Sequence, residues 1–251
     1  MIAYPGLFWF PVFLIPLLVL QRQLHKEIQA ILLLLTRRAD VSIVLFSLIF
    51  FPGVAIHELS HWLMAKLLRV HTGRFSLIPR PMANGRLRLG LVETAPTNLL
   101  GEALIGTAPL LAGGAFVAYA GWFHLGVSQI YPYSIPLNGA TWEEAISLAI
   151  GQPDFWLWVY LTFVISSTMF PSSSDRRAWL PLLLIAALTV GLVFLAGAGP
   201  WFIQNFAPVL DAALQSITFI LAISLGLHLI FFLPAFLVRQ GLSRITHMRV
   251  V

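Results

Sequence analysis

Apolar residues fall in long runs along this chain, and short polar stretches separate the runs. The runs lie at about 4–20, 41–65, 100–120, 155–172, 179–198 and 210–238. A helix needs roughly 20 consecutive apolar residues to cross the hydrocarbon core of a bilayer. The pattern therefore predicts an all-α polytopic membrane protein with about six transmembrane helices. The shorter run Ile31–Leu35 cannot span, and we expect it to lie in the membrane interface.

Composition strengthens this prediction. The chain is 59% hydrophobic and only 10% charged, whereas soluble domains carry roughly 25% charged residues. It has no cysteine, which excludes disulfides and thiolate metal sites. The net charge of +5 comes from basic residues grouped in loops, as is usual in membrane proteins. We therefore expect a lipid bilayer as partner and no nucleic acid.

The basic residues also predict an orientation. They form four patches, at 22–38, 66–88, 176–177 and 239–249, whereas the loops 121–154 and 199–209 carry none. With six spans, the last three patches share one side of the membrane, and basic loops are typically cytoplasmic. The first patch would then lie outside, so the topology of the N-terminal segment 1–40 stays open.

One of these spans contains a motif with chemical meaning. The residues His57-Glu58-Leu59-Ser60-His61 lie within the otherwise apolar stretch Val41–Leu68. On a helix, H-E-x-x-H sets two imidazoles one turn apart on one face, spaced to bind one zinc ion, with a glutamate beside them as base. Ionisable residues inside a membrane cost free energy and are functional candidates by default. The structural alternative is a pair of buried histidines that hydrogen-bond neighbouring helices.

The backbone just before the motif carries a second signal. Pro52-Gly53 lies one turn before His57, where proline can kink the helix and admit water to the site. An ordinary transmembrane proline kink explains the dipeptide equally well.

A β-hairpin is predicted directly after this helix. Phe75–Ile78 and Arg86–Val92 have strand-like composition, and Asn84-Gly85 between them is a turn signal. An exposed strand edge there could pair with an unwound substrate segment.

Two histidines do not complete a catalytic zinc site, which usually has three protein ligands. Asp175, just past the fourth span, reaches the same side and a similar depth as His57. Glu102, at the start of the third span, is also on that side, so both carboxylates remain candidates.

These residues resemble the site-2 protease family of zinc intramembrane metalloproteases. That family carries H-E-x-x-H on one core helix and, two helices later, an aspartate ligand in a polar segment with proline; Pro171 and Asp175 match that segment. The family often has asparagine eight residues before the aspartate, followed by Asp-Gly at the ligand. This chain has Ser167 and Asp175-Arg176 instead. It is therefore similar to a divergent member.

The resemblance covers about 41–180, so 1–38 and 180–251 are expected as accessory helices of a single domain 1–251. The glycine-rich segment Gly106–Gly114 resembles a family segment in which small residues let helices approach closely. The simpler interpretation of this segment is helix packing alone.

The resemblance implies a zinc endopeptidase that cuts a membrane-protein substrate in or near a transmembrane segment. His57, His61 and Asp175 would bind Zn²⁺, and Glu58 would act as general acid and base. The protein would lie in a prokaryotic plasma membrane with its active site toward the cytoplasm. His228, in the last span at about the depth of His57, is either a supporting residue of the site or a buried histidine bonded across helices.

Two other functions stay open. A divalent-metal transporter could use the histidine pair as a transit site, and an inactive relative could bind membrane proteins without cutting them. Ionisable groups gathered at one end of two helices favour hydrolysis over transport, and the intact Glu58 favours an active enzyme.

Overall fold

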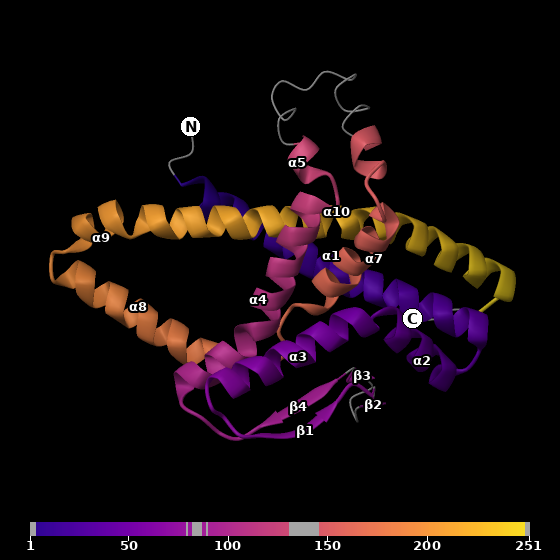
Figure 1. Cartoon of the computed structure of the whole chain (residues 1–251), viewed down its shortest axis with the longest axis horizontal. Helices are drawn as coiled ribbons and strands as arrows, with labels where there is room; N and C mark the ends of the chain where they lie inside the picture. Colours follow the sequence, from indigo (N-terminus) through magenta and orange to yellow (C-terminus); the bar gives the residue numbers. More distant parts are fainter. Residues whose placement is uncertain (1–3, 79, 82–86, 89, 131–145, 249–251) are drawn as a thin grey trace.

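The fold is a helical bundle with a small β-structure at one end, seen in a computed structural model (Figure 1). The structure describes residues 4–78, 80–81, 87–88, 90–130 and 146–248. The elements are, in order, α1 (Pro5–Thr36), α2 (Ala39–Ile49), α3 (Phe51–Leu67), β1 (Thr72–Ser76), β2 (Arg80–Pro81), β3 (Leu87–Arg88), β4 (Leu91–Thr94), α4 (Leu99–Phe123), α5 (Val127–Ile130), α7 (Phe155–Thr168), α8 (Trp179–Leu195), α9 (Gly199–Asn205) and α10 (Ala207–Thr246).

The helix lengths fit a membrane protein. Within the described residues, α1, α4 and the stretch 199–246 are each long and apolar enough to cross a membrane, and α2 with α3 adds a fourth if this bent pair counts as one span. α7 and α8 are apolar but have only 14 and 17 residues. Six complete spans, as expected from the sequence, are therefore not shown. The runs expected at 4–20 and 31–35 belong to one helix, α1.

The run expected as one span at 41–65 is broken at Phe50, where α2 and α3 meet at an angle of 69°. Pro52 lies in the first turn of α3 and has no N–H for the carbonyl four residues earlier. The Tyr160 hydroxyl donates a hydrogen bond to the carbonyl of Ile49, at 2.8 Å, and so satisfies one exposed backbone group at the break. The kink predicted near Pro52-Gly53 is confirmed.

The end of α7 packs closely on the start of α3. Gly53 lies against the Thr168 hydroxyl and the Val164 carbonyl, and a side chain at Gly53 would overlap both. Next to this contact is an apolar cluster of Leu24, Phe46, Phe50, Val54, Phe163, Val164 and Ile165. These contacts hold α3 and α7 at a fixed separation beside the H-E-x-x-H motif.

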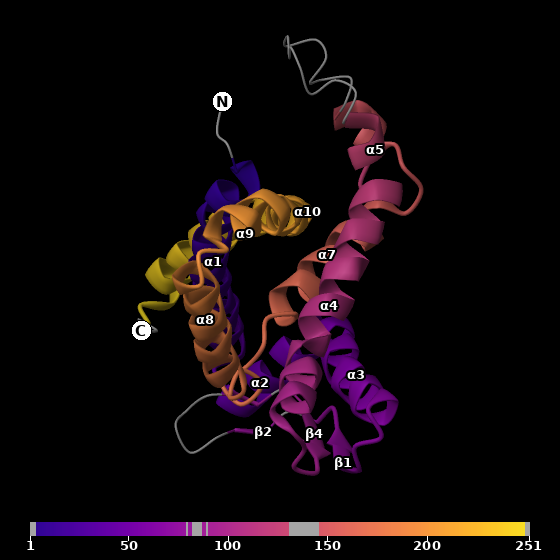
Figure 2. The same ribbon diagram turned by 90° about the vertical axis from the view of Figure 1, so that its left-hand side faces the viewer.

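The first and last long helices, α1 and α10, run side by side in both views (Figures 1 and 2). Near one end, the buried Asp211 carboxylate accepts a hydrogen bond from the backbone N–H of Leu7, at 3.0 Å, in the first turn of α1. Near the other end, Arg239 pairs with Glu27. Early residues of α1 contact early residues of α10, and late residues contact late ones, so the two helices run parallel. Polar contacts join them near both ends.

The hairpin predicted after the motif helix is present. β1 pairs antiparallel with β4, with Phe75 opposite Val92, and β2 pairs antiparallel with β3 between them. The first strand starts at Thr72, three residues before the sequence prediction. The predicted turn at Asn84-Gly85 lies outside the described residues. Figure 1 shows the hairpin running beneath α3, and β4 contacts α3 and lines the same cavity as the motif histidines.

Candidate metal centre

The two histidines of the motif lie on one face of α3, as the spacing predicts. Their Nε2 atoms are 3.2 Å apart. The Nδ1 atom of His57 lies 2.7 Å from the Thr168 carbonyl at the end of α7, and that of His61 lies 2.7 Å from the Ile105 carbonyl on α4. A carbonyl accepts only, so each Nδ1 carries the proton and each Nε2 presents a lone pair. Both rings are thus oriented for metal binding.

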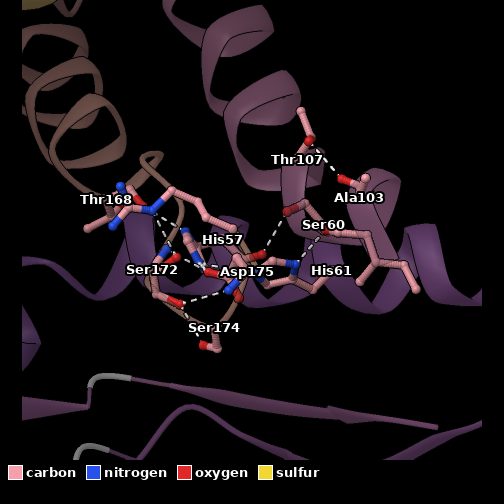
Figure 3. A network of polar contacts seen from close by, with 11 residues as sticks. His57, Ser60, His61, Ala103, Thr107, Thr168, Ser172, Ser174 and Asp175 are labelled. Atoms are coloured by element: carbon pink, nitrogen blue, oxygen red, sulfur yellow. Dashed lines mark hydrogen bonds and ion pairs between the residues drawn. The ribbon is translucent and has the colours of Figure 1, made fainter. Parts of the chain in front are cut away.

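Asp175 meets these nitrogens from the loop between α7 and α8 (Figure 3). Its Oδ2 atom lies 3.8 Å from Nε2 of His57 and 3.7 Å from Nε2 of His61. The same oxygen accepts a hydrogen bond from the backbone N–H of Ser172, at 2.7 Å. The three side chains form a group whose potential ligand atoms lie within 4.8 Å of one another, so they can hold a metal ion.

The three separations test whether zinc fits. For ligand bonds of about 2.0–2.1 Å in a tetrahedron, the ligand atoms lie about 3.4 Å apart. The observed separations of 3.2, 3.7 and 3.8 Å are within a few tenths of an ångström of that value. Two imidazoles and one carboxylate also match the donor types of catalytic zinc sites, which keep a fourth position for water. The residues present therefore fit a zinc ion.

The surroundings keep Asp175 ionised. Burial alone would raise the pKa of its carboxyl, but the attraction of the His57 and His61 rings in their protonated form and the hydrogen bond from Ser172 outweigh burial and hold that pKa well below its usual range. The side chain is therefore a carboxylate at neutral pH, the form that binds a metal ion.

A glycine lets the Asp175 loop approach α4. A Cβ atom on Gly106 would overlap the backbone carbonyl of Asp175, and that backbone cannot swing aside as a side chain can. Gly113 on the same helix is packed similarly against the Cβ of Met169. Close approach, predicted for the glycine-rich segment, thus also positions a candidate ligand.

Glu58 belongs to α3, and its buried side chain packs against the residue just before β4. Gly90, immediately before β4, covers it. A Cβ atom on Gly90 would lie 2.5 Å from both Cγ and Oε1 of Glu58. The backbone at residue 90 therefore packs directly on the candidate general base, and a side chain there would displace it.

All these groups line one cavity of about 860 Å³. Its wall includes His57, Glu58 and His61 of the motif, most of the segment from Gly90 to Thr97 and the loop from Ser172 to Ala178. Glu102, the alternative third ligand, also lines the cavity, but among the described residues the metal-binding group comprises His57, His61 and Asp175 without it.

His228 connects α10 to α7. It is fully buried, its Nδ1 lies 2.7 Å from the Ser224 carbonyl, and its Nε2 lies 2.9 Å from the Ser167 hydroxyl. Since Nδ1 carries the proton, the Ser167 hydroxyl donates to Nε2. The side chain of Gln21 on α1 donates to the carbonyl of Ser167. The next residue in the chain, Thr168, supplies the carbonyl that orients His57. His228 is thus bonded across helices, to the residue that precedes the one orienting His57.

Sequence reasoning did not single out several of these groups. The carbonyls of Ile105 and Thr168 have no residue-type signal, because every residue carries a carbonyl. Gly90 and the cavity-lining His25 were also missed. For His25, the sequence offers one signal: it follows Gln21 by four residues, so the two polar side chains lie on the same face of a helix.

Comparison with known proteins found no matching family model, no matching curated protein and no matching solved structure.

Proposed function

We propose that this protein is a zinc-dependent endopeptidase of the site-2 protease type, which cuts a membrane protein in or near a transmembrane segment. The main support is the convergence of two Nε2 lone pairs and the Asp175 carboxylate next to Glu58, inside a cavity of a chain with membrane-length helices. A divalent-metal transporter would also need the ligands, but transporters carry ionisable residues on several spans, whereas the candidate ligands and Glu58 all lie at one cavity.

Each residue has a defined role in this proposal. His57, His61 and Asp175 would hold the zinc, which supplies a Lewis acid for the peptide carbonyl and lowers the pKa of water toward about 7. Glu58 takes a proton from the attacking water and delivers it to the leaving amine. Its enclosure by Gly90 limits its motion, which favours proton transfer at a fixed position.

The hairpin supports an extended substrate. Leu91, Val92 and Thr94 of β4 all line the cavity. A strand beside the metal centre can pair through its backbone with an unwound segment, which exposes the carbonyl to be attacked. Proline in place of Val92 would therefore reduce cleavage while zinc stays bound. Cleavage at the wild-type rate in that variant would count against strand pairing.

The test is elemental analysis of purified protein in detergent together with a cleavage assay. We expect about one zinc per chain in the wild type and in Glu58→Gln, which cannot take the proton and should not cleave. Asp175→Ala should lose zinc and Glu102→Ala should keep it. A folded wild type without zinc would refute the proposal, whereas loss of zinc only in Glu102→Ala would reassign the third ligand.

A further inference from the structure

Two arginines in the cavity wall have no part in the proposed chemistry. Arg176 and Arg177 directly follow the candidate ligand Asp175, and both line the cavity with exposed side chains. The family that the chain resembles often has glycine after this aspartate, so the arginine pair departs from that pattern. The charge of the pair is a feature of this chain that metal binding does not explain.

The backbone that carries the two arginines is fixed on both sides. The Asp175 carbonyl packs against Gly106 of α4, and Ala178 is buried directly after the pair. Between these points, the backbone N–H of Arg177 donates to the Ser174 carbonyl, at 3.2 Å. The two side chains therefore extend from a turn whose position beside the candidate ligand is set before any ligand binds, which lowers the cost of binding.

Neither arginine has an anionic partner in the part of the chain that the structure describes. Arg176 makes one side-chain hydrogen bond there, from Nε to the Ser172 carbonyl at 3.3 Å, and its two terminal nitrogens remain for a ligand. Arg177 makes no side-chain hydrogen bond among these residues. The ion pairs of the described chain involve other side chains, namely Arg38 with Asp40, Arg239 with Glu27, and Asp175 with the two motif histidines.

The carboxylates of the cavity wall do not neutralise the pair. Glu58 is buried against Gly90, and Asp175 faces the motif histidines. With a divalent ion bound, its formal charge balances these two carboxylates. The remaining wall carboxylate, Glu102, makes no ion pair with either arginine. The loaded cavity therefore keeps a net positive charge beside the metal centre, which attracts an anion.

Hydrogen bonds place Arg176 near the candidate ligands. Its Nε donates to the Ser172 carbonyl, and the N–H of Ser172 donates to Oδ2 of Asp175 at 2.7 Å (Figure 3). From backbone dimensions, the Arg176 Nε lies within about 10 Å of that ligand oxygen. An extended peptide advances about 3.3 Å per residue, so side chains up to about three residues from the bond to be cut lie within reach.

We propose that Arg176 and Arg177 form a carboxylate-binding subsite, which selects an aspartate or glutamate of the substrate within about three residues of the bond to be cut. The guanidinium group presents paired N–H donors that match the two oxygens of a carboxylate. This inference rests on the proposed endopeptidase function. Because carboxylates are rare within the hydrocarbon core, it also predicts cleavage close to one end of a transmembrane segment.

Lipid phosphates also attract arginine at a membrane surface. A headgroup held by this pair would lie in the same cavity as the metal centre and would obstruct the substrate. The shared cavity therefore favours a carboxylate of the substrate itself as the anion.

Peptidyl hydroxamates test the subsite without a known substrate, because the hydroxamate binds zinc and leaves the side chains to contact the cavity. Two series of leucine peptides would carry the hydroxamate at the C-terminus or the N-terminus, with the other end blocked. Each would contain one aspartate, or its neutral isostere asparagine, at one of the first four positions. In the second series, a free instead of a blocked C-terminus would show whether a terminal carboxylate serves as well as a side chain.

Binding to the zinc-loaded full chain in detergent would be measured by calorimetry. We expect aspartate at one position to bind wild type about fivefold tighter than asparagine, the upper range for an ion pair open to solvent. Raising NaCl from about 20 mM to about 500 mM shortens the screening length from about 20 Å to about 4 Å, so it should remove most of this preference.

Variants identify the residues responsible. Arg177→Gln should reduce the preference for aspartate to about twofold, the double substitution Arg176→Gln with Arg177→Gln should abolish it, and Arg177→Lys should keep most of it. Arg244→Gln removes an exposed arginine outside the cavity and is the matched control, which should keep the full preference. Unchanged zinc content and unchanged affinity for the asparagine peptides would show that the metal centre is intact in each variant.

The outcomes separate the two proposals. Hydroxamate binding with no preference for aspartate at any position, or a preference that survives the double substitution, would overturn the subsite and leave the endopeptidase proposal standing. If added phosphatidylglycerol weakens the binding of every peptide in wild type but not in the double variant, the pair binds lipid phosphate and its role toward the substrate is overturned. A wild type that binds neither zinc nor any hydroxamate would overturn both proposals.

Discussion

Replacing Gly90 with alanine should abolish most activity without unfolding the protein or releasing zinc. The new Cβ would lie 2.5 Å from Cγ and Oε1 of Glu58 and 2.7 Å from Cδ, whereas ordinary contacts begin at 3.4 Å. The Glu58 carboxylate must therefore retreat by about 1 Å, a displacement that can cost about 10²-fold in rate. The atoms that must move belong to a buried side chain and not to backbone, so the free energy of unfolding should fall by about 1–3 kcal/mol.

The assay would follow hydrolysis of fluorescein-labelled casein by detergent-solubilised protein, with Glu58→Gln as the zero. Gly73→Ala is the matched control, because Gly73 lies in the same hairpin and its Cβ would be 3.1 Å from Oε2 of an exposed glutamate, Glu93. We expect that control to cleave at the wild-type rate. A folded Gly90→Ala protein with full zinc and full activity would refute the argument that this glycine positions the general base.

Two further substitutions test the supports of the metal centre. Gly106→Ala should lower the free energy of unfolding by about 1–3 kcal/mol, because its Cβ meets the backbone of Asp175. The control Gly226→Ala meets nothing and should be neutral or slightly stabilising. Thermal unfolding followed by tryptophan fluorescence would measure both variants, and equal midpoints would contradict the packing argument. His228→Leu should weaken zinc binding about tenfold, as is found when groups that support metal ligands are removed, whereas the control His124→Leu should leave zinc affinity unchanged. Competition with a chelator of known affinity would measure zinc binding. Unchanged affinity in His228→Leu would show that the hydrogen bond from α10 to α7 does not orient the site.

Local features of the metal centre could be predicted from the sequence. The spacing of His57 and His61 places both rings on one face of any α-helix, because i and i+4 positions are neighbours with 3.6 residues per turn. The break near Pro52 follows from a missing N–H, and the hairpin follows from strand and turn composition. These features depend on nearby residues only, so the sequence determines them wherever the segment lies.

Long-range packing decided the remaining features. Whether Asp175 or Glu102 joins the histidines depends on how the α7–α8 loop lies against Gly106, and both carboxylates satisfied the expected topology. The 69° bend between α2 and α3 shortened an expected span, although the apolar run was long enough. Backbone carbonyls from α4 and α7 orient the histidines, and the cavity beside them is lined by residues from α1, α3, β4, α4 and α7. Such groups come together only when distant helices pack, because hydropathy indicates which segments can enter a membrane but not which neighbours their side chains meet.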